Sequence, residues 1–162
     1  MGNFYVDVIC KDLRFNRPAR VSDVLLLEPV TRGLVEAVLD EARQRGEDLL
    51  VYETFRSRAR QLDLYKRGAS KLREVGVHHY GLACDVVKNI NGDPSWKGSF
   101  ALVGELAKKH GLVWGGDWGS PGKRHSFVDL VHVQRISVAR QGALFRGEWY
   151  PATDYSPPRE AP

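Results

Sequence analysis

The stretch of sequence that decides the fold is HHYGLACD, residues 78–85. It begins with a histidine and ends with an aspartate, and both residue types are common metal ligands. A fully extended chain would place His78 and Asp85 about 23 Å apart, too far for both to bind one ion. The chain must therefore reverse between them, and Gly81 permits this because it tolerates backbone angles that are closed to other residues.

The residues after this reversal, 81–87, have the composition of a β-strand. Because side chains alternate along a strand, Asp85 shares a face with Ala83 while Cys84 points the other way. The small Ala83 leaves room beside an ion, and Cys84 is not expected to be a ligand. With only one other cysteine, Cys10, the chain cannot form a disulfide framework, so we expect two buried thiols.

A second acidic residue and histidine, Asp129 and His132, lie three positions apart near the end of the chain. This offset puts them on opposite faces of a regular strand, so a shared site requires a bulge or a strand end. A hydrolytic zinc site uses three nitrogen, sulfur or oxygen ligands from the protein and leaves one position for water. The candidates for such a site are therefore His78, Asp85, Asp129 and His132.

Hydrophobic periodicity and turn residues predict alternating helices and strands through the middle of the chain. The expected helices are residues 31–45, 57–68 and 99–110, and the expected strands are residues 48–55, 81–87, 112–114 and 127–134. Ser57 and Ser99 are expected to cap their helices, and the turn chemistry of residues 89–94 predicts a loop. Residues 1–30 are expected to form an extended or strand-like lead-in.

The composition is that of one globular domain, with 43% hydrophobic and 27% charged residues in 162. We expect a single α+β domain over residues 1–150, a small, mainly antiparallel sheet flanked by helices, and a proline-rich tail over 151–162. No apolar run approaches membrane-spanning length, and the N-terminus lacks a signal-peptide pattern, which predicts synthesis in the cytoplasm. A net charge of +4 favours an anionic partner, either nucleic acid or acidic envelope polymers.

Both histidine segments resemble signatures of one family, the M15 zinc peptidases. Residues 78–85 resemble its HxxGxAxD signature, and residues 129–132, DLVH, resemble its second signature, an acidic residue three before a ligand histidine. Residues 114–118, WGGDW, are similar to a segment of the phage endolysin branch, whose members cleave between L-alanine and D-glutamate. Residues 54–57, TFRS, resemble the family's YRS segment, so the likeness runs from about residue 48 to 134.

The resemblance implies a fold like that of Hedgehog and D-alanyl-D-alanine peptidases, with zinc at the sheet's edge or in a cleft over it. It implies zinc bound by His78, Asp85 and His132, with Asp129 as the general base. Arg56 would hold a carboxylate of the substrate, since its planar fork of donors matches that group. The other substrate contacts that it implies are Ser57, Trp114 and Asp117.

The sequence departs from the family pattern around these residues. Gly76 stands where serine is usual, and Val131 and Val133 replace a proline and an aromatic residue beside the last ligand. Residues 119–125 resemble an insertion. These departures bear on substrate detail more than on the metal site.

Several of these residues also have a structural interpretation. His110 and His125 are expected to be structural or surface residues, and His79 to lie behind the ligands or face solvent. Trp114, Trp118 and Asp117 fit a packing or turn role as well as substrate contact. Arg56 alternatively forms a surface ion pair.

The favoured hypothesis is a zinc-dependent L-alanyl-D-glutamate endopeptidase that acts on peptidoglycan as a phage-type endolysin. Such an enzyme is expected to be a monomer that stays in the host cytoplasm until lysis and then reaches the cell wall. The alternatives are a D-alanyl-D-alanine carboxypeptidase or dipeptidase of the same fold and a zinc-binding cell-wall recognition module without catalysis. A nucleic-acid binder has only the charge in its favour, because no binding motif is present.

Overall fold

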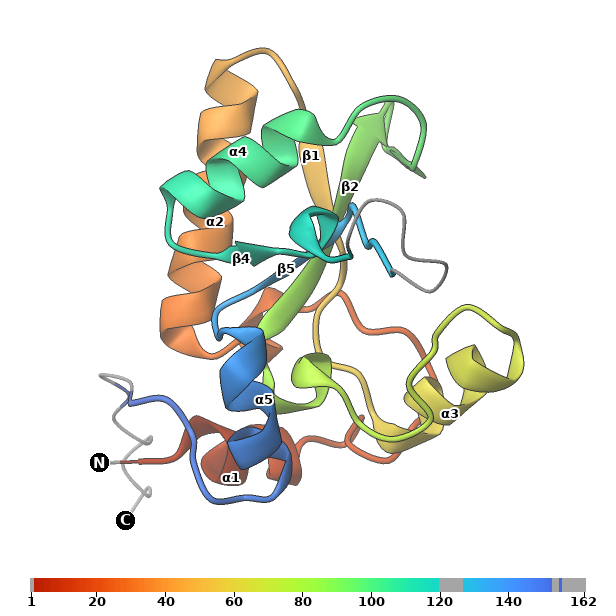
Figure 1. Cartoon of the computed structure of the whole chain (residues 1–162), viewed down its shortest axis with the longest axis vertical. Helices are drawn as coiled ribbons and strands as arrows, with labels where there is room; N and C mark the ends of the chain where they lie inside the picture. The colour runs from red at the N-terminus through yellow and green to blue at the C-terminus, as the bar shows by residue number, and fades with distance from the viewer. Residues whose placement is uncertain (1, 120–126, 153–154, 156–162) are drawn as a thin grey trace.

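The centre of the protein is a small antiparallel sheet, as the sequence predicts. The computed structural model describes residues 2–119, 127–152 and 155. Within them the strands lie in the order β1 (Leu49–Glu53), β2 (Ala83–Ile90), β5 (His132–Gln134) and β4 (Val113–Trp114), and β3 (Asp93–Ser95) also pairs with β2 (Figure 1). Every one of these pairings is antiparallel.

Two helices cover one face of the sheet and form the main core with it. Helices α2 (Pro29–Gln44) and α4 (Ala101–Lys109) lie together on the left of the sheet in Figure 1. Val38 of α2, Val103 of α4 and Val86 of β2 are buried in this core. Full burial of such a side chain is worth about 1.5–3 kcal/mol, so the core fixes β2 firmly.

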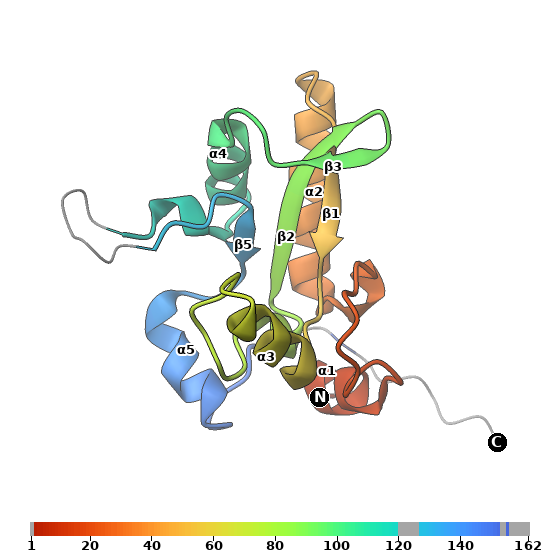
Figure 2. The ribbon, with the colours of Figure 1, turned by 90° about the vertical axis from the view of Figure 1, so that its right-hand side faces the viewer.

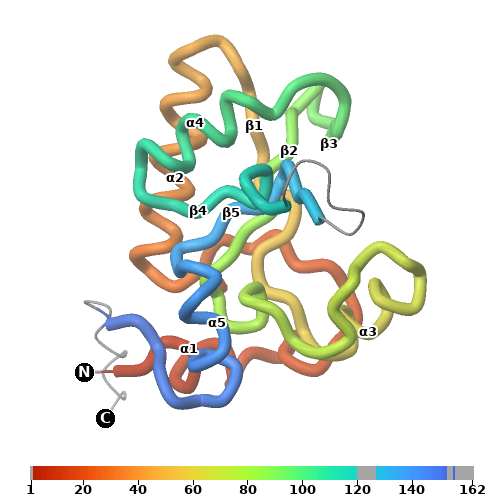
Figure 3. Tube along the Cα trace, in the orientation of Figure 1, coloured from red at the N-terminus to blue at the C-terminus, as the bar shows by residue number. Residues whose placement is uncertain are grey.

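The opposite face of the sheet carries the cavity described below. Figure 2 looks onto this face, with α3 (Arg58–Lys66) and α5 (Val138–Phe145) at its lower end and α2 behind the sheet. The trace in Figure 3 shows the chain leaving α3, looping outward and returning to the start of β2. The loop of residues 69–77 thus stands beside the open face.

The helix boundaries lie near the predicted ones, but the predicted Ser99 cap is wrong: the N-cap of α4 is Phe100, and Ser99 Oγ instead accepts from the N–H of Ala101 at 3.1 Å. Helix α2 begins at Pro29, two residues before the predicted start, because both carboxylate oxygens of Glu28 accept from the backbone N–H groups of Val30 and Thr31. Ser57 caps α3, accepting from the N–H of Arg60 at 3.0 Å.

Several predicted elements differ in the structure. The predicted loop at 89–94 is wrong, because β2 and β3 form a hairpin whose turn contains only Asn91 (φ 54°) and Gly92 (φ 91°). Only residues 132–134 of the strand predicted at 127–134 pair in the sheet. Helix α5 was not predicted.

The N-terminal lead-in forms no strand over residues 2–28 and contains short helical turns joined by irregular chain. It contains α1 (Phe4–Asp7) and two 3₁₀ turns, η1 (Ile9–Lys11) and η2 (Val24–Leu26). Phe4 and Ile9 pack with Phe55 in a separate apolar cluster. The hydrophobic pattern of a few neighbouring residues does not reveal this contact, because Phe55 lies far along the chain. Cys84 is buried as expected, but Cys10 is exposed because it lies on the outer side of η1.

The start of the predicted tail contacts the domain. Pro151 is buried, the carbonyl of Ala152 accepts from Arg135 at 3.0 Å, and the ring of Tyr155 packs edge-on against Phe4. The rest of 151–162 lies outside the described residues, so the division into a domain and a tail stays a prediction. Within the part that the structure describes, no helix combines the length and apolar character that a membrane crossing requires.

Candidate metal centre

The three predicted ligands come from three different elements. His78 lies in the 3₁₀ turn η3 (Val77–Tyr80), which Gly81 ends in the left-handed conformation at φ 70°. A Cβ at Gly81 would lie 2.8 Å from the carbonyl oxygen of Leu26, so glycine is required by both conformation and space. Asp85 lies on β2 directly opposite His132, the first residue of β5. The reversal predicted between His78 and Asp85 is confirmed.

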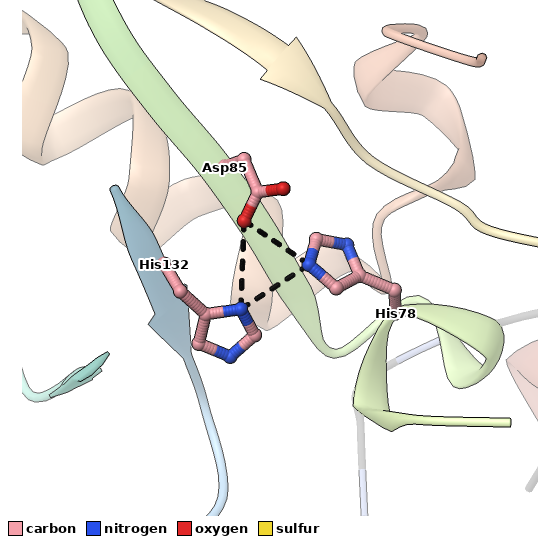
Figure 4. A group of neighbouring side chains, drawn as sticks. All are labelled: His78, Asp85 and His132. Atoms are coloured by element: carbon pink, nitrogen blue, oxygen red, sulfur yellow. Dashed lines mark hydrogen bonds and ion pairs between the residues drawn. The ribbon is translucent and has the colours of Figure 1, made fainter. Parts of the chain in front are cut away.

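The facing atoms of these residues converge as metal ligands do (Figure 4). His78 Nε2 lies 3.2 Å from Asp85 Oδ1 and 3.2 Å from His132 Nδ1, and the third side of the triangle is 3.5 Å. Ligands at zinc bond lengths in a tetrahedron are about 3.3 Å apart. All three residues are buried, so the spacing of the donors fits a single zinc ion.

The outer nitrogens of both imidazoles are hydrogen-bonded to acceptors. His78 Nδ1 lies 2.7 Å from the carbonyl oxygen of Thr54, and His132 Nε2 lies 2.9 Å from Gln134 Oε1. We therefore assign the ring protons to these outer nitrogens, which leaves lone pairs on the inner ones. Two lone pairs and a carboxylate oxygen then point at one spot, an arrangement that a cation stabilises.

The electrostatics of the group agree with a bound cation. Burial would raise the pKa of Asp85, but its interactions with His78, His132 and Arg56 hold it well below its usual range. Burial would likewise lower the pKa of His132, but Asp85 outweighs this effect and raises it. The residues present therefore suit a positive ion.

A buried ion-pair network holds the remaining oxygen of Asp85. Arg56 Nη2 donates to Asp85 Oδ2 at 3.1 Å and to Glu53 Oε2 at 3.0 Å, and Arg56 Nε donates to Glu53 Oε1 at 3.2 Å. Arg60 adds a further bond to Glu53 at 3.1 Å. Burial would lower the pKa of Arg56, but Asp85 and Glu53 raise it, so the guanidinium stays charged and orients Asp85.

Asp129 is placed beside the candidate ligands by a tight turn. It precedes β5, its N–H donates to Gly115 at 3.0 Å, and its carbonyl accepts from His132 at 3.4 Å. A Cβ at Gly115 would lie 2.4 Å from the Asp129 carbonyl, so this turn depends on glycine. The strand-end arrangement that the sequence required is confirmed. Burial, followed by the charge of Asp85, raises the pKa of Asp129 above its ordinary value.

A cavity of about 790 Å³ contains this group. Its lining includes the three candidate ligands, Asp129 and Arg56, together with parts of the 69–77 loop and α5. Trp118 also lines it, with its ring centroid 4.9 Å from that of His132. The volume is of the size that holds a small peptide or similar ligand.

The other predicted substrate contacts are not among the described residues that line the cavity. Ser57 donates to the carbonyl of Arg17 and caps α3. Trp114 donates to the carbonyl of Leu130 at 2.8 Å and packs against Gly104 and Gly116, where any Cβ would overlap its ring. Asp117 is exposed and pairs with Lys108 at 3.2 Å. Their substrate roles stay predictions, and the structure gives each a structural role.

The remaining histidines have structural partners where the structure describes them. His79 is buried rather than solvent-facing, between the Tyr5 hydroxyl at 2.9 Å and the Arg56 carbonyl at 3.1 Å. His110 pairs with Glu41 at 2.7 Å, which confirms its structural interpretation. His125 and the predicted insertion, apart from residue 119, lie outside the described residues.

Sequence reasoning missed two supporting residues. Glu53 holds Arg56 in place through their ion pair. In the sequence, the only sign of this pair is that an acidic residue lies three positions before an arginine. Gln134 accepts from His132 and from Gln141 Nε2 at 3.3 Å, while its own amide donates to the carbonyl of Ile136 at 2.7 Å. Because Gln134 follows His132 by two on a strand, alternation places both on one face.

A buried His–Asp–His set in a cavity with a neighbouring carboxylate is typical of metal-dependent hydrolases. A family model described as D-alanyl-D-alanine carboxypeptidase, of the M15 peptidases, matches residues 71–135. The chain is 31% identical to the peptidoglycan L-alanyl-D-glutamate endopeptidase CwlK of Bacillus subtilis, over 68% of this chain and 74% of that protein. The chain belongs to the M15 peptidase family and is a peptidase of that family.

Two further relatives carry the same kind of name. The L-alanyl-D-glutamate peptidase of Listeria phage A118 is 30% identical over 70% of this chain, which spans only 40% of the phage protein. The crystal structure of the Serratia marcescens L-Ala D-Glu endopeptidase ChiX has a TM-score of 0.53 and 25% identity, over 73% of this chain and 90% of that one. The fold is therefore that of the M15 and D-alanyl-D-alanine peptidases, as the resemblance implied.

Proposed function

We propose that this protein is a zinc-dependent endopeptidase that hydrolyses the L-alanyl-D-glutamate bond of the peptidoglycan stem peptide. The observation that carries the proposal is the convergence of His78, Asp85 and His132 at 3.2–3.5 Å beside Asp129. The relatives CwlK, the Listeria phage protein and ChiX are all named as L-alanyl-D-glutamate peptidases, which supports the choice of this bond. The similarity to a phage protein supports a role as an endolysin in host lysis.

The residues of the chain divide the chemical work between them. Zinc, held by His78, Asp85 and His132, would supply a Lewis acid that polarises the scissile carbonyl and makes water more acidic. Asp129 takes the proton from the attacking water and passes it to the departing amine of D-glutamate. The raised pKa of Asp129 suits the first half of this transfer, because the carboxylate of a less acidic carboxyl group takes a proton from water more readily.

Substrate positioning is proposed for Arg56, which lines the cavity. Its guanidinium has five N–H donors, and the described contacts to Glu53, Asp85 and Gln61 use four of them. One donor of Nη1 is left for a substrate carboxylate or carbonyl. Arg56 would thus orient Asp85 and contact the substrate with the same group.

A second candidate is a D-alanyl-D-alanine carboxypeptidase or dipeptidase. The description of the matching family model favours it, since that model is named for this activity. The relatives with 30% and 31% identity favour the endopeptidase. A recognition module without catalysis is less well supported, because it would not need Asp129 beside the metal ligands.

The test is digestion of purified peptidoglycan followed by mass spectrometry of the products. We expect fragments with new D-glutamate amino ends, no release with a strong chelator, and recovery on adding zinc. An Asp129→Ala variant should bind zinc normally and release no fragments. Release of terminal D-alanine alone would instead support the second candidate, and equal release by the variant would refute the role of Asp129.

The site of action and the assembly state are also proposals. We propose that the enzyme is a monomer that stays in the host cytoplasm until the membrane is breached and then acts on the cell wall. Light scattering of the purified protein tests the first part. Fractionation of infected cells before and after lysis tests the second.

A further inference from the structure

Two aromatic side chains continue the cavity beyond the metal ligands. Tyr52, on β1, and Trp96, just after β3, both line it, and their rings meet edge to face with centroids 4.7 Å apart. The guanidinium of Arg20 lies 4.2 Å from the centroid of the Tyr52 ring and donates to the Tyr52 carbonyl. Tyr52 is thus held in place, while Trp96 is 50% exposed and its ring remains available to a ligand.

The strand register fixes how far this aromatic pair lies from the metal ligands. Ser95 is opposite Lys88 in the last pair of this ladder. Continuing the register by one residue would place Trp96 at the level of Val87, which lies two residues beyond Asp85 on the same face of β2. Two residues along a strand correspond to about 7 Å. Figure 2 shows β3 beside the upper end of β2, on the open face of the sheet.

We propose that Tyr52 and Trp96 form a platform for the muramyl sugar that carries the scissile alanine, an inference that rests on the proposed function. In peptidoglycan, the amino group of this alanine is acylated by the lactyl group of the sugar. The alanine and the lactyl group together span about two residue lengths, or about 7 Å. This matches the distance along β2 from Asp85 to the level of Trp96.

The chemistry of the platform suits a sugar. A pyranose ring has a face of C–H groups that packs on a flat aromatic surface, while its hydroxyl groups stay at the rim in water. Tryptophan offers such a surface with only two side-chain torsions to order. The peptide beyond D-glutamate carries carboxylate groups, which would favour a cation such as Lys71, at another part of the cavity lining.

The experiment compares two substrates that share the scissile bond. One is an N-acetylmuramoyl stem tripeptide and the other is the N-lactoyl form of the same tripeptide, which lacks only the sugar. We expect the zinc-loaded wild-type enzyme to cleave the muramoyl substrate with about tenfold higher kcat/KM. Trp96→Ala should remove about tenfold of kcat/KM on that substrate and change the lactoyl substrate less than twofold.

Two further variants separate the platform from general damage. Trp96→Phe keeps an aromatic face and should retain most of the preference for the sugar. Ile90→Ala removes another exposed apolar side chain, 54% exposed, from the same hairpin but outside the cavity lining, and should change neither substrate. N-Acetylmuramoyl-L-alanine, the product, should inhibit the wild-type enzyme more strongly than N-lactoyl-L-alanine and lose this advantage in Trp96→Ala.

The outcomes distinguish this inference from the function on which it rests. Cleavage of both substrates with equal kcat/KM would leave the endopeptidase standing and overturn the sugar platform. Equal losses on both substrates in Trp96→Ala would assign the ring to the peptide and overturn it as well. Failure to cleave the L-alanyl-D-glutamate bond in either substrate would refute the proposed function itself.

Discussion

We expect the substitution Glu53→Gln to weaken metal binding, although Glu53 does not contact the atoms that would bind the metal. Glu53 is 2% exposed, and its carboxylate accepts two bonds from Arg56 and one from Arg60. Glutamine keeps one acceptor oxygen and turns an amide toward a guanidinium. The loss of at least one charge-assisted bond and of a buried charge should cost about 2–4 kcal/mol of unfolding free energy.

The effect on the metal follows from Arg56, which then has only Asp85 as a carboxylate partner in this network. With its anchor gone, Arg56 no longer fixes the orientation of Asp85. Loss of such outer support typically weakens metal binding by about 10–100-fold. The assay is competition for zinc against a chromophoric chelator, on protein shown to be folded by circular dichroism.

The matched control is Glu105→Gln, which removes the same charge from an exposed pair with Arg45. Such surface pairs contribute about 0–1 kcal/mol, so stability and zinc affinity should stay near those of the wild type. A Glu53→Gln protein that is folded and binds zinc within twofold of the wild type would refute the orienting role assigned to Arg56.

Three other perturbations test the fold and the site. A chelator should lower the melting temperature, because zinc at a thousandfold excess over its Kd stabilises by about 4 kcal/mol, and calorimetry with and without zinc measures this. Gly81→Ala should lower the free energy of unfolding, measured in urea, by more than about 2 kcal/mol, since the new Cβ would overlap the Leu26 carbonyl. Its control, Gly46→Ala, also has a positive φ but lies in open space and should cost about 1 kcal/mol. Hydrogen bonds, led by that from Lys109, lower the pKa of Glu41 from 4.5 to about 2, so this contribution to stability is complete above pH 4.5 and is lost as the pH falls toward 2. Acid titration of Glu41→Gln by circular dichroism should show a smaller loss of stability in that window, and an unchanged profile would contradict it.

The candidate ligands could be predicted because short sequence segments carry them. Gly81 and the seven-residue spacing demanded a reversal, and the offset between Asp129 and His132 demanded a strand end. Glu53 and Gln134 could not be predicted in this way, since each matters through a side chain that only the folded sheet brings near. A buried acid at position 53 is meaningful only once Arg56 and Asp85 are known to face it.

The misread elements have similar causes. The hairpin of β2 and β3 contains Asn91 and Gly92, a two-residue turn, but the surrounding polar residues resemble a longer loop. The helical N-terminal segment gains its stability from contacts with Phe55, far along the chain. Periodicity in a short window carries no information about such contacts.

His78 and His132 are 54 residues apart in sequence yet meet across one ion-sized space. An ion bound there would crosslink the two ends of the intervening segment, which includes β3, α4 and β4. This crosslink would reduce the conformational entropy that the segment gains on unfolding. Three bonds to one ion would thus also close a large loop of the polypeptide. Metal binding at this site would therefore stabilise the tertiary structure in addition to its proposed part in the chemistry.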